Sequence, residues 1–188
     1  MRPPPGVTPL RSAPRLSTRR RALAYSDPLA HGLVAAAVVL PLVPRFGRRP
    51  LLSAVAAALA IDLDHPVAAR SLRLAPMVSM QARPPTHNLL SALAAGGVGA
   101  VAGGAVHGWA AFAGLSSHLL YDSADSAAPT PLLWPLRPPR QLGCARAGAG
   151  LAALTVGSWL LSRAESGATG PAAAAPGGGG GSTPPRTA

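Results

Sequence analysis

Five apolar stretches fill the middle of the chain, and none has the polar face that a helix of a soluble protein turns to water. They span about residues 29–44, 51–63, 89–106, 107–121 and 147–162. Each is shorter than the roughly 20 residues that cross a bilayer comfortably. Their many small residues nevertheless permit close helix packing in lipid. The pattern predicts an all-α fold, a small polytopic membrane helical bundle of about four to five transmembrane helices; a soluble bundle of fully buried helices is the alternative.

The two ends of the chain differ in composition from this apolar middle. Residues 1–24 are rich in proline and arginine, and residues 164–188 are a low-complexity segment of Ala, Gly and Pro. Neither segment has enough apolar side chains to build a core. We therefore expect a disordered basic arm over 1–24, the bundle over 25–163 and a disordered tail over 164–188.

The chain is strongly basic, with 17 arginines, no lysine and a net charge of +11. Such a charge is typical of proteins that bind nucleic acid. Here, however, the arginines lie between apolar runs and are not interleaved with aromatic residues, which favours the lipid bilayer as the partner and argues against nucleic acid. The single cysteine, Cys144, excludes a disulfide within the chain.

Most of the histidines and acidic residues fall at one end of the predicted bundle. If the apolar stretches cross in alternation, four separate elements bring seven such residues to the same side, and only one histidine, His107, falls at the opposite side. Polar side chains at membrane depth cost about 2–3 kcal/mol each, so they need partners or a bound ion. The seven residues are His31, Asp62, Asp64, His65, His87, His118 and Asp122.

Imidazole and carboxylate together are a common ligand set for divalent metals. His118 and Asp122 are four residues apart and share one helix face, and Asp62 and His65, three apart, can do the same. Asp64 faces the same side only if the helix has ended before Pro66. We predict one or two divalent ions at this end, zinc first, with manganese, iron or magnesium as alternatives. The competing interpretation is a hydrogen-bonded cluster that only ties helices together.

The distribution of arginine predicts the orientation in the membrane. Twelve of the 17 arginines fall on the side of the histidines and aspartates. By the positive-inside rule this side faces the cytoplasm, in a multi-pass protein of the inner (plasma) membrane. Arg45, Arg48 and Arg49 fall on the other side and count against this orientation.

Four motifs in this order resemble the YdjM-like family of LexA-regulated, inner-membrane-associated proteins, which are regarded as metal-dependent hydrolases. They are His31 in the first apolar stretch, "DLDHP" (62–66), "RPPTHNLLSAL" (83–93) and "HLLYDSADSAAPTPLLWPL" (118–136). The resemblance covers about residues 26–140. The chain departs from the family pattern at three positions, where Ala82 replaces a histidine, Asn88 a serine and Asp125 a threonine.

The resemblance and the residues together predict a membrane-bound hydrolase that acts on a lipid ester or phosphoester. Metal would activate water, Asp64 or Asp125 would accept its proton, and Arg83 would steady the negative charge that develops. Two other functions remain open. One is a non-enzymatic membrane scaffold or stress-response protein with a structural His/Asp cluster, and the other is a transporter, which the absence of an internal repeat disfavours.

Overall fold

The computed structural model describes residues 18–78, 80, 83–125 and 128–168, and over these residues the chain is helical. The described part contains no strand, only one isolated antiparallel bridge between Thr130 and Arg140. The predicted all-α class is confirmed. Helix extends beyond the predicted bundle boundaries at 25 and 163, and the rest of both predicted arms lies outside the described residues.

Each of the five apolar stretches forms a helix. The short Gly47 turn, with φ of 70°, reverses the chain after the first stretch, and Gly104, with φ of 83°, does so after the third. A positive φ is readily adopted only by glycine, which explains this residue type at both turns. The helical elements are α1 (Thr18–Val39), η1 (Leu40–Leu42), α2 (Val43–Phe46), α3 (Arg49–Ala60), η2 (Ile61–Asp64), α4 (His65–Ala68), α5 (Leu74–Val78), α6 (Leu89–Gly103), α7 (Ala105–Asp125) and α8 (Cys144–Ala168).

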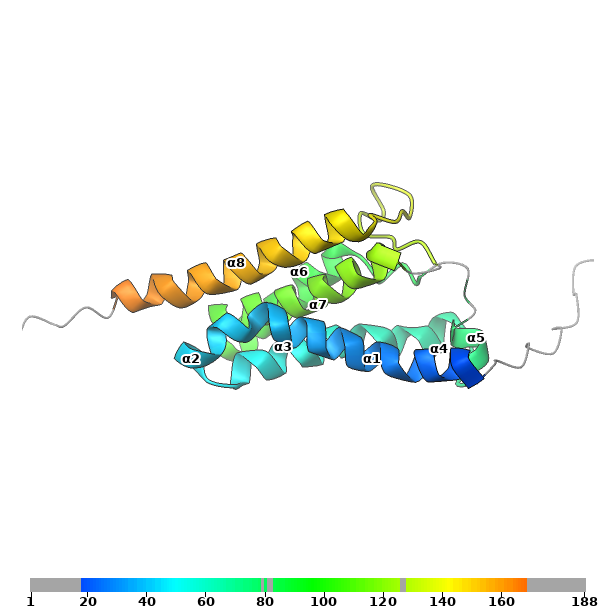
Figure 1. The fold of residues 1–188 in the computed structure, drawn as a ribbon, viewed down its shortest axis with the longest axis horizontal. Helices are drawn as coiled ribbons and strands as arrows, with labels where there is room; N and C mark the ends of the chain where they lie inside the picture. The colour runs from blue at the N-terminus through cyan, green and yellow to red at the C-terminus, as the bar shows by residue number, and fades with distance from the viewer. Residues whose placement is uncertain (1–17, 79, 81–82, 126–127, 169–188) are drawn as a thin grey trace, which may run out of the picture.

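Helix α7 is the centre of the bundle and packs against α1, α3, α6 and α8. The long helices run roughly along one axis, so the bundle has two distinct ends (Figure 1). A core cluster joins the last turns of α1 to α3 and α7; its buried members are Val38, Val39, Leu42, Ala54, Ala110 and Ala113. Because these contacts lie away from the start of α1, they fix the helices without filling the end that carries the polar residues.

Three segments are long and apolar enough to cross a membrane: Ser26–Phe46, Arg49–Ala68 and Cys144–Ala164. Helix α6 is also apolar but has only 15 residues. Helix α7 has 21 residues, about 31 Å of helix, and it buries histidine, serine and aspartate side chains between its neighbours. The structure thus supports the predicted membrane bundle and identifies three candidate spans within it.

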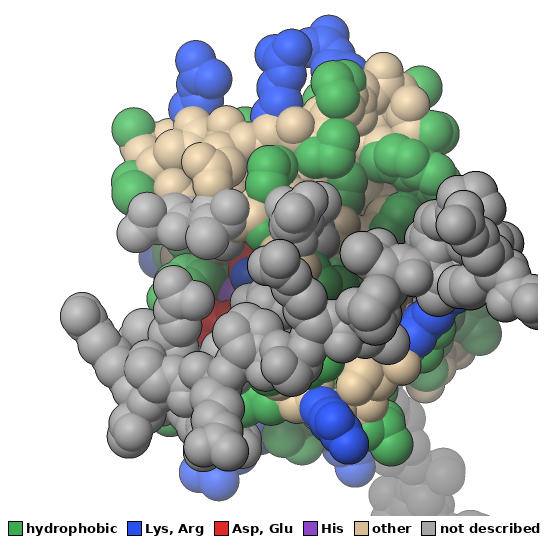
Figure 2. All heavy atoms as spheres, turned by 90° about the vertical axis from the view of Figure 1, so that its right-hand side faces the viewer, with side chains coloured by type: hydrophobic (Ala, Val, Ile, Leu, Met, Phe, Trp, Pro, Cys, Tyr) green, Lys and Arg blue, Asp and Glu red, His purple; other side chains and the backbone are tan. Residues whose placement is uncertain are grey.

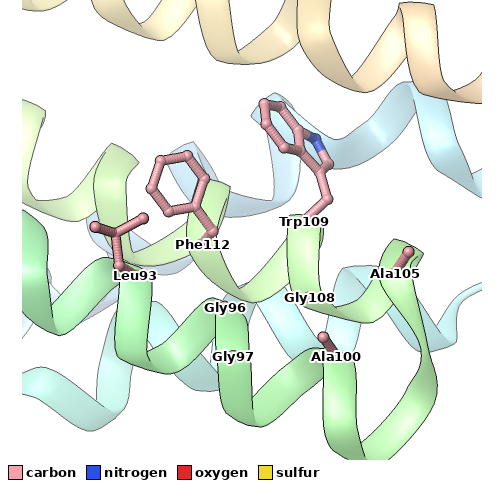
Figure 3. Close-up of a pocket in the computed structure, with 8 residues that line it drawn as sticks. All are labelled: Leu93, Gly96, Gly97, Ala100, Ala105, Gly108, Trp109 and Phe112. Carbon is pink, nitrogen blue, oxygen red and sulfur yellow. The ribbon is translucent and has the colours of Figure 1, made fainter.

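Glycine allows α7 to approach its neighbours closely. A Cβ atom on Gly108 would lie 2.9 Å from the carbonyl oxygen of Gly96 in α6, and one on Gly114 would collide with the backbone of Ala54 in α3. Between α6 and α7 lies an open apolar groove of about 410 Å³, lined in part by Leu93, Trp109 and Phe112 (Figure 3). The small residues therefore determine helix spacing, and hence how far apart side chains on α3 and α7 lie.

The stretches "SDPLAH" (26–31) and "THNLL" (86–90) predict helix N-caps at Asp27 and Thr86, and both predictions are wrong. Asp27 and Pro28 were expected to start the first helix, but α1 begins at Thr18 and Pro28 lies inside it. Thr86 was expected to cap the third helix, but Asn88 holds that position, and its side chain accepts a hydrogen bond from the Ser91 amide. Both displaced residues, Asp27 and Thr86, instead contact the polar cluster described next.

Candidate metal centre

Four elements deliver histidine and aspartate side chains to the same end of the bundle. His31 comes from α1, His65 from the start of α4, His87 from the loop before α6, and His118 from α7. His31, His87 and His118 are fully buried, and His65 is 8% exposed. Figure 2 looks onto this end and shows histidine and acidic side chains in the middle of the face, with arginine side chains towards its edges. The predicted convergence at one end is therefore present in the structure.

The four imidazole rings form one continuous group. His31 and His118 are stacked, with ring centroids 3.6 Å apart and an interplanar angle of 18°. His87 meets His118 edge-on at 5.4 Å, and His65 meets His87 edge-on at 5.0 Å. Buried imidazoles this close cannot all carry a positive charge at once, and an imidazole must be neutral to bind metal.

The Nε2 atoms of three histidines face two carboxylates. His118 Nε2 lies 3.5 Å from Asp62 Oδ1 and 3.4 Å from Asp122 Oδ2. His87 Nε2 lies 3.6 Å from Asp62 Oδ1 and 3.9 Å from Asp122 Oδ2. His31 Nε2 lies 3.5 Å from Asp122 Oδ1. The two carboxylates and three ring nitrogens thus surround one small region between α1, η2 and α7.

The 3₁₀ turn η2 explains how the Asp62–His65 segment faces this region. Residues three apart eclipse one another in a 3₁₀ helix, so Asp62 and His65 share a face, with His65 Nδ1 3.5 Å from Asp62 Oδ1. Asp64 also turns inward, with Oδ1 3.0 Å from His65 Nδ1 and Oδ2 3.2 Å from His87 Nδ1. It also accepts a hydrogen bond from the Thr86 hydroxyl. The tightening of the helix before Pro66 brings all three residues to the site.

Arg83 is the positive charge of the cluster. Its Nη2 donates to Asp122 Oδ1 at 2.6 Å, and its Nη1 contacts His65 Nε2 at 3.1 Å. Asp27 Oδ2 is 4.0 Å from the same guanidinium, and Asp27 Oδ1 is 3.7 Å from His31 Nε2. The side chain of Arg83 is only 16% exposed, against 44% for Asp27. Arg83 therefore joins the two halves of the cluster, while Asp27 lies at its rim.

The donor atoms fit a divalent cation. Both ring nitrogens of His31, His87 and His118 are buried and have no hydrogen-bond partner of acceptable geometry among the described residues, and the same holds for Asp122 Oδ2. Ligands bound at 2.0–2.1 Å to one ion lie about 2.8–3.0 Å apart along the edges of an octahedron and about 3.3–3.4 Å apart along those of a tetrahedron. The distances from the three Nε2 atoms to the nearest oxygens of Asp62 and Asp122 are 3.4–3.9 Å, at or slightly above the upper end of that range. The donors therefore face one small region that an ion could occupy.

Three overlapping triads bring their donor atoms within 4.8 Å of one another. They are His31, Asp62 and His118; Asp62, His65 and His87; and His87, His118 and Asp122. No residue belongs to all three triads, but Asp62, His87 and His118 each belong to two. The described residues thus contain groups that could hold a metal ion, and these groups form one connected cluster.

Comparison with known proteins agrees with this architecture. The family model of the YdjM inner membrane protein matches residues 27–176. The chain belongs to the YdjM inner membrane protein family. No curated protein and no solved structure matches the chain.

Within this member of the YdjM family, all seven residues predicted as ligands lie in the one cluster, and Arg83 lies there too. His107 is in the first turn of α7 at the opposite end of the bundle, as expected. The side chain of Asp125, a predicted proton acceptor, lies outside the described residues, as does the Ala82 position.

Sequence reasoning missed Asp27 and Thr86 as members of the site. A signal for Asp27 was available, because it precedes His31 by four residues, the same spacing that pairs His118 with Asp122. Thr86 had no comparable signal, since its contact with Asp64 depends on how the loop before α6 folds back onto η2. The family match adds only that both residues belong to an inner membrane protein.

The electrostatics of the cluster are clearest at His87, which lies in the loop outside the candidate spans. Burial disfavours its protonated form, but the carboxylates of Asp62, Asp64 and Asp122 outweigh burial and raise the pKa of His87 above its ordinary value. The negative charge of these carboxylates, which stabilises the protonated ring, would attract a divalent cation for the same electrostatic reason.

Proposed function

We propose that this protein is a membrane-bound, metal-dependent hydrolase with its site at the cytoplasmic face of the inner membrane. The observation that carries the proposal is the buried group of unpartnered Nε2 atoms facing Asp62 and Asp122. A structure that needed only to tie helices together would pair these atoms with each other, because unpaired buried polar atoms are destabilising. Zinc is the first candidate for the ion, and manganese, iron and magnesium are the alternatives.

A bound divalent ion would supply a water molecule of lowered pKa and polarise the bond to be broken. The chain supplies the surroundings. The fully buried imidazoles keep bulk water from one side of the site, while Asp62, with a side chain 27% exposed, leaves the other side accessible. Asp27 is the most exposed carboxylate at the rim and is placed to pass a proton to solvent. Arg83 offsets negative charge beside Asp122.

The substrate class follows from where the site lies. The cluster is at the end of helices that are apolar enough to cross a membrane, so a substrate with a headgroup at the membrane surface can reach it. A lipid ester or phosphoester fits this position, and Arg83 suits an anionic group. The excess of arginine at this end supports a cytoplasmic orientation.

The direct test is to purify the protein in detergent, measure bound metal, and repeat the measurement with His118→Ala and Asp122→Ala. Both variants should lose the ion, and His107→Ala, a histidine at the other end of the bundle, should keep it. Asp27→Asn should keep the ion but slow hydrolysis of ester or phosphoester substrates by about 100-fold or more, which is the usual contribution of an acid–base group. Unchanged metal content in the first two variants contradicts the proposal.

The second candidate is a non-enzymatic scaffold in which the cluster holds the bundle together. The buried Arg83–Asp122 ion pair favours it, because that pair joins the loop before α6 to α7. In this case removal of metal lowers thermal stability, and panels of ester and phosphoester substrates show no hydrolysis. Turnover of any such substrate that depends on both the ion and Asp27 separates the two functions.

A further inference from the structure

The cluster divides into two layers around the ring of His87. The Nε2 side of this ring faces Asp62 and Asp122, at 3.6 and 3.9 Å. The Nδ1 side faces Asp64, at 3.2 Å. The two nitrogens of an imidazole point in divergent directions, so a single ion bound at Nε2 lies on the far side of the ring from Asp64. Asp64 and Asp62 therefore cannot both bind the same ion as His87.

The oxygens of Asp64 already have other neighbours. Oδ1 lies 3.0 Å from His65 Nδ1, and Oδ2 accepts a hydrogen bond from the Thr86 hydroxyl as well as facing His87 Nδ1. Two ring nitrogens and one hydroxyl thus surround a single carboxylate. At these distances an outer carboxylate can accept the second N–H of a metal-binding histidine and so fix the ring.

Arg83 determines the protonation of His65. A guanidinium only donates hydrogen bonds, so the contact of 3.1 Å between Arg83 Nη1 and His65 Nε2 makes that nitrogen the acceptor. The proton of the neutral ring then sits on Nδ1, which faces Asp64. In this arrangement Nε2 accepts from Arg83 and Nδ1 carries the proton, which leaves the ring without a free lone pair for a metal.

The charges of the inner cluster balance as a whole. Asp62, Asp64 and Asp122 carry three negative charges. A divalent cation would supply two positive charges, and Arg83, which pairs directly with Asp122 and reaches Asp64 only through His65, supplies the third. Asp27, at the rim and 44% exposed, is left to solvent.

We propose that Asp64 is a positioning residue and not a ligand, and that one ion is held by the remaining ring nitrogens and carboxylates. Asp64 fixes His87 with Nε2 towards the ion and His65 with Nε2 towards Arg83. The ligand residues are then His31, Asp62, His87, His118 and Asp122. The inference rests on the proposed metal site and assigns different roles to two aspartates in the same 3₁₀ turn.

The matched pair Asp62→Asn and Asp64→Asn tests this assignment, because both changes remove one carboxylate from η2. Wild-type protein should hold one ion per chain by elemental analysis. Asp64→Asn should still bind one ion at saturation, with affinity about 10- to 100-fold lower, and with the wild-type visible spectrum when Co²⁺ is the probe. Asp62→Asn should change that spectrum. Asp64→Glu should recover part of the affinity, and His107→Ala should leave both measurements unchanged.

Nuclear magnetic resonance of wild-type protein with ¹⁵N-labelled histidine and bound Zn²⁺ gives a test that needs no variant. His87 should be bound through Nε2 with a proton on Nδ1, and His65 should be unbound. Two ions per chain, a metal-bound His65, or a Co²⁺ spectrum altered equally by both Asn variants overturns the inference but not the proposed hydrolase. Absence of any ion in wild-type protein overturns both, and a bound ion without hydrolysis overturns only the hydrolase.

Discussion

His31 and His118 stack face to face, with ring centroids 3.6 Å apart, although 87 positions separate them in the chain. Each ring also directs its Nε2 atom at the carboxylate of Asp122. Stacking and metal binding therefore use different parts of the same side chain: the ring face joins α1 to α7, and the nitrogen at its edge faces the site. A substitution can separate the two roles.

His31→Phe keeps an aromatic ring against His118 but removes the nitrogen. We expect the free energy of unfolding of the metal-free variant to lie within about 1.5 kcal/mol of the wild-type value, as for other shape-conserving replacements in a core. Metal affinity should fall by at least about 100-fold, the upper end of what loss of an outer partner of a ligand costs. Thermal unfolding with and without added Zn²⁺ measures both quantities. Full stabilisation of the variant by Zn²⁺ would show that His31 is only a packing residue.

Arg83 forms the shortest ion pair among the described residues, with 2.6 Å between its Nη2 and Asp122 Oδ1, and Asp122 is 2% exposed. Arg83→Met should destabilise the metal-free protein by about 3–5 kcal/mol, because removal of one partner leaves a buried charge unpaired. In an Asp122→Asn background the same change should cost less. A double-mutant cycle of unfolding free energies in detergent checks the coupling, and additive effects would contradict a direct pair.

The apolar stretches predicted the helices because a helix that faces lipid or protein on all sides needs no polar stripe to interrupt its apolar sequence. The same periodicity placed His31, His87 and His118 at one end, since alternating helices return to the same side. Distances could not be predicted in this way. Asp64 faces the site only because the helix tightens into a 3₁₀ turn before Pro66, and Arg83 reaches Asp122 only because the segment just before α6 lies against the end of α7.

The roles of Asp27 and Thr86 show a second limit. Both residue types are favoured helix caps, and a cap is a local property that a short window of sequence predicts. The structure instead uses them at the cluster, where Asp27 lies near Arg83 of the loop before α6 as well as near His31, and Thr86 contacts Asp64, 22 positions away. Local propensity was outweighed by tertiary contacts in both places, and both places are at the site.

Gly114 sets the distance between α3 and α7, and through it the distance between Asp62 and His118. A side chain there would collide with the backbone of Ala54. Gly114→Ala should therefore cost about 1–3 kcal/mol of stability, as overpacking does, and should weaken metal binding by moving Asp62 away from His118. Gly97→Ala is the matched control, since a Cβ there has no neighbour within 4 Å. Thermal unfolding should show Gly114→Ala to be less stable than wild type and Gly97→Ala to be slightly more stable, because alanine favours helix over glycine. Metal titration should show weaker binding in Gly114→Ala but not in the control.

Metal binding should depend on pH through His87. Its carboxylate neighbours raise its pKa despite burial, so in the metal-free protein a proton occupies the ring up to a higher pH than in the unfolded chain. That protonation stabilises the metal-free fold below the unfolded pKa, about 6.5, and the benefit is lost as the pH rises through the raised value.

A metal that binds His87 must displace this proton. Affinity for Zn²⁺, measured by competition with a chelator, should therefore fall as the pH decreases through the raised pKa, and in His87→Gln the affinity should be lower throughout and its pH dependence flatter. An affinity for Zn²⁺ that stays constant across this range in wild-type protein would mean that His87 does not bind the ion.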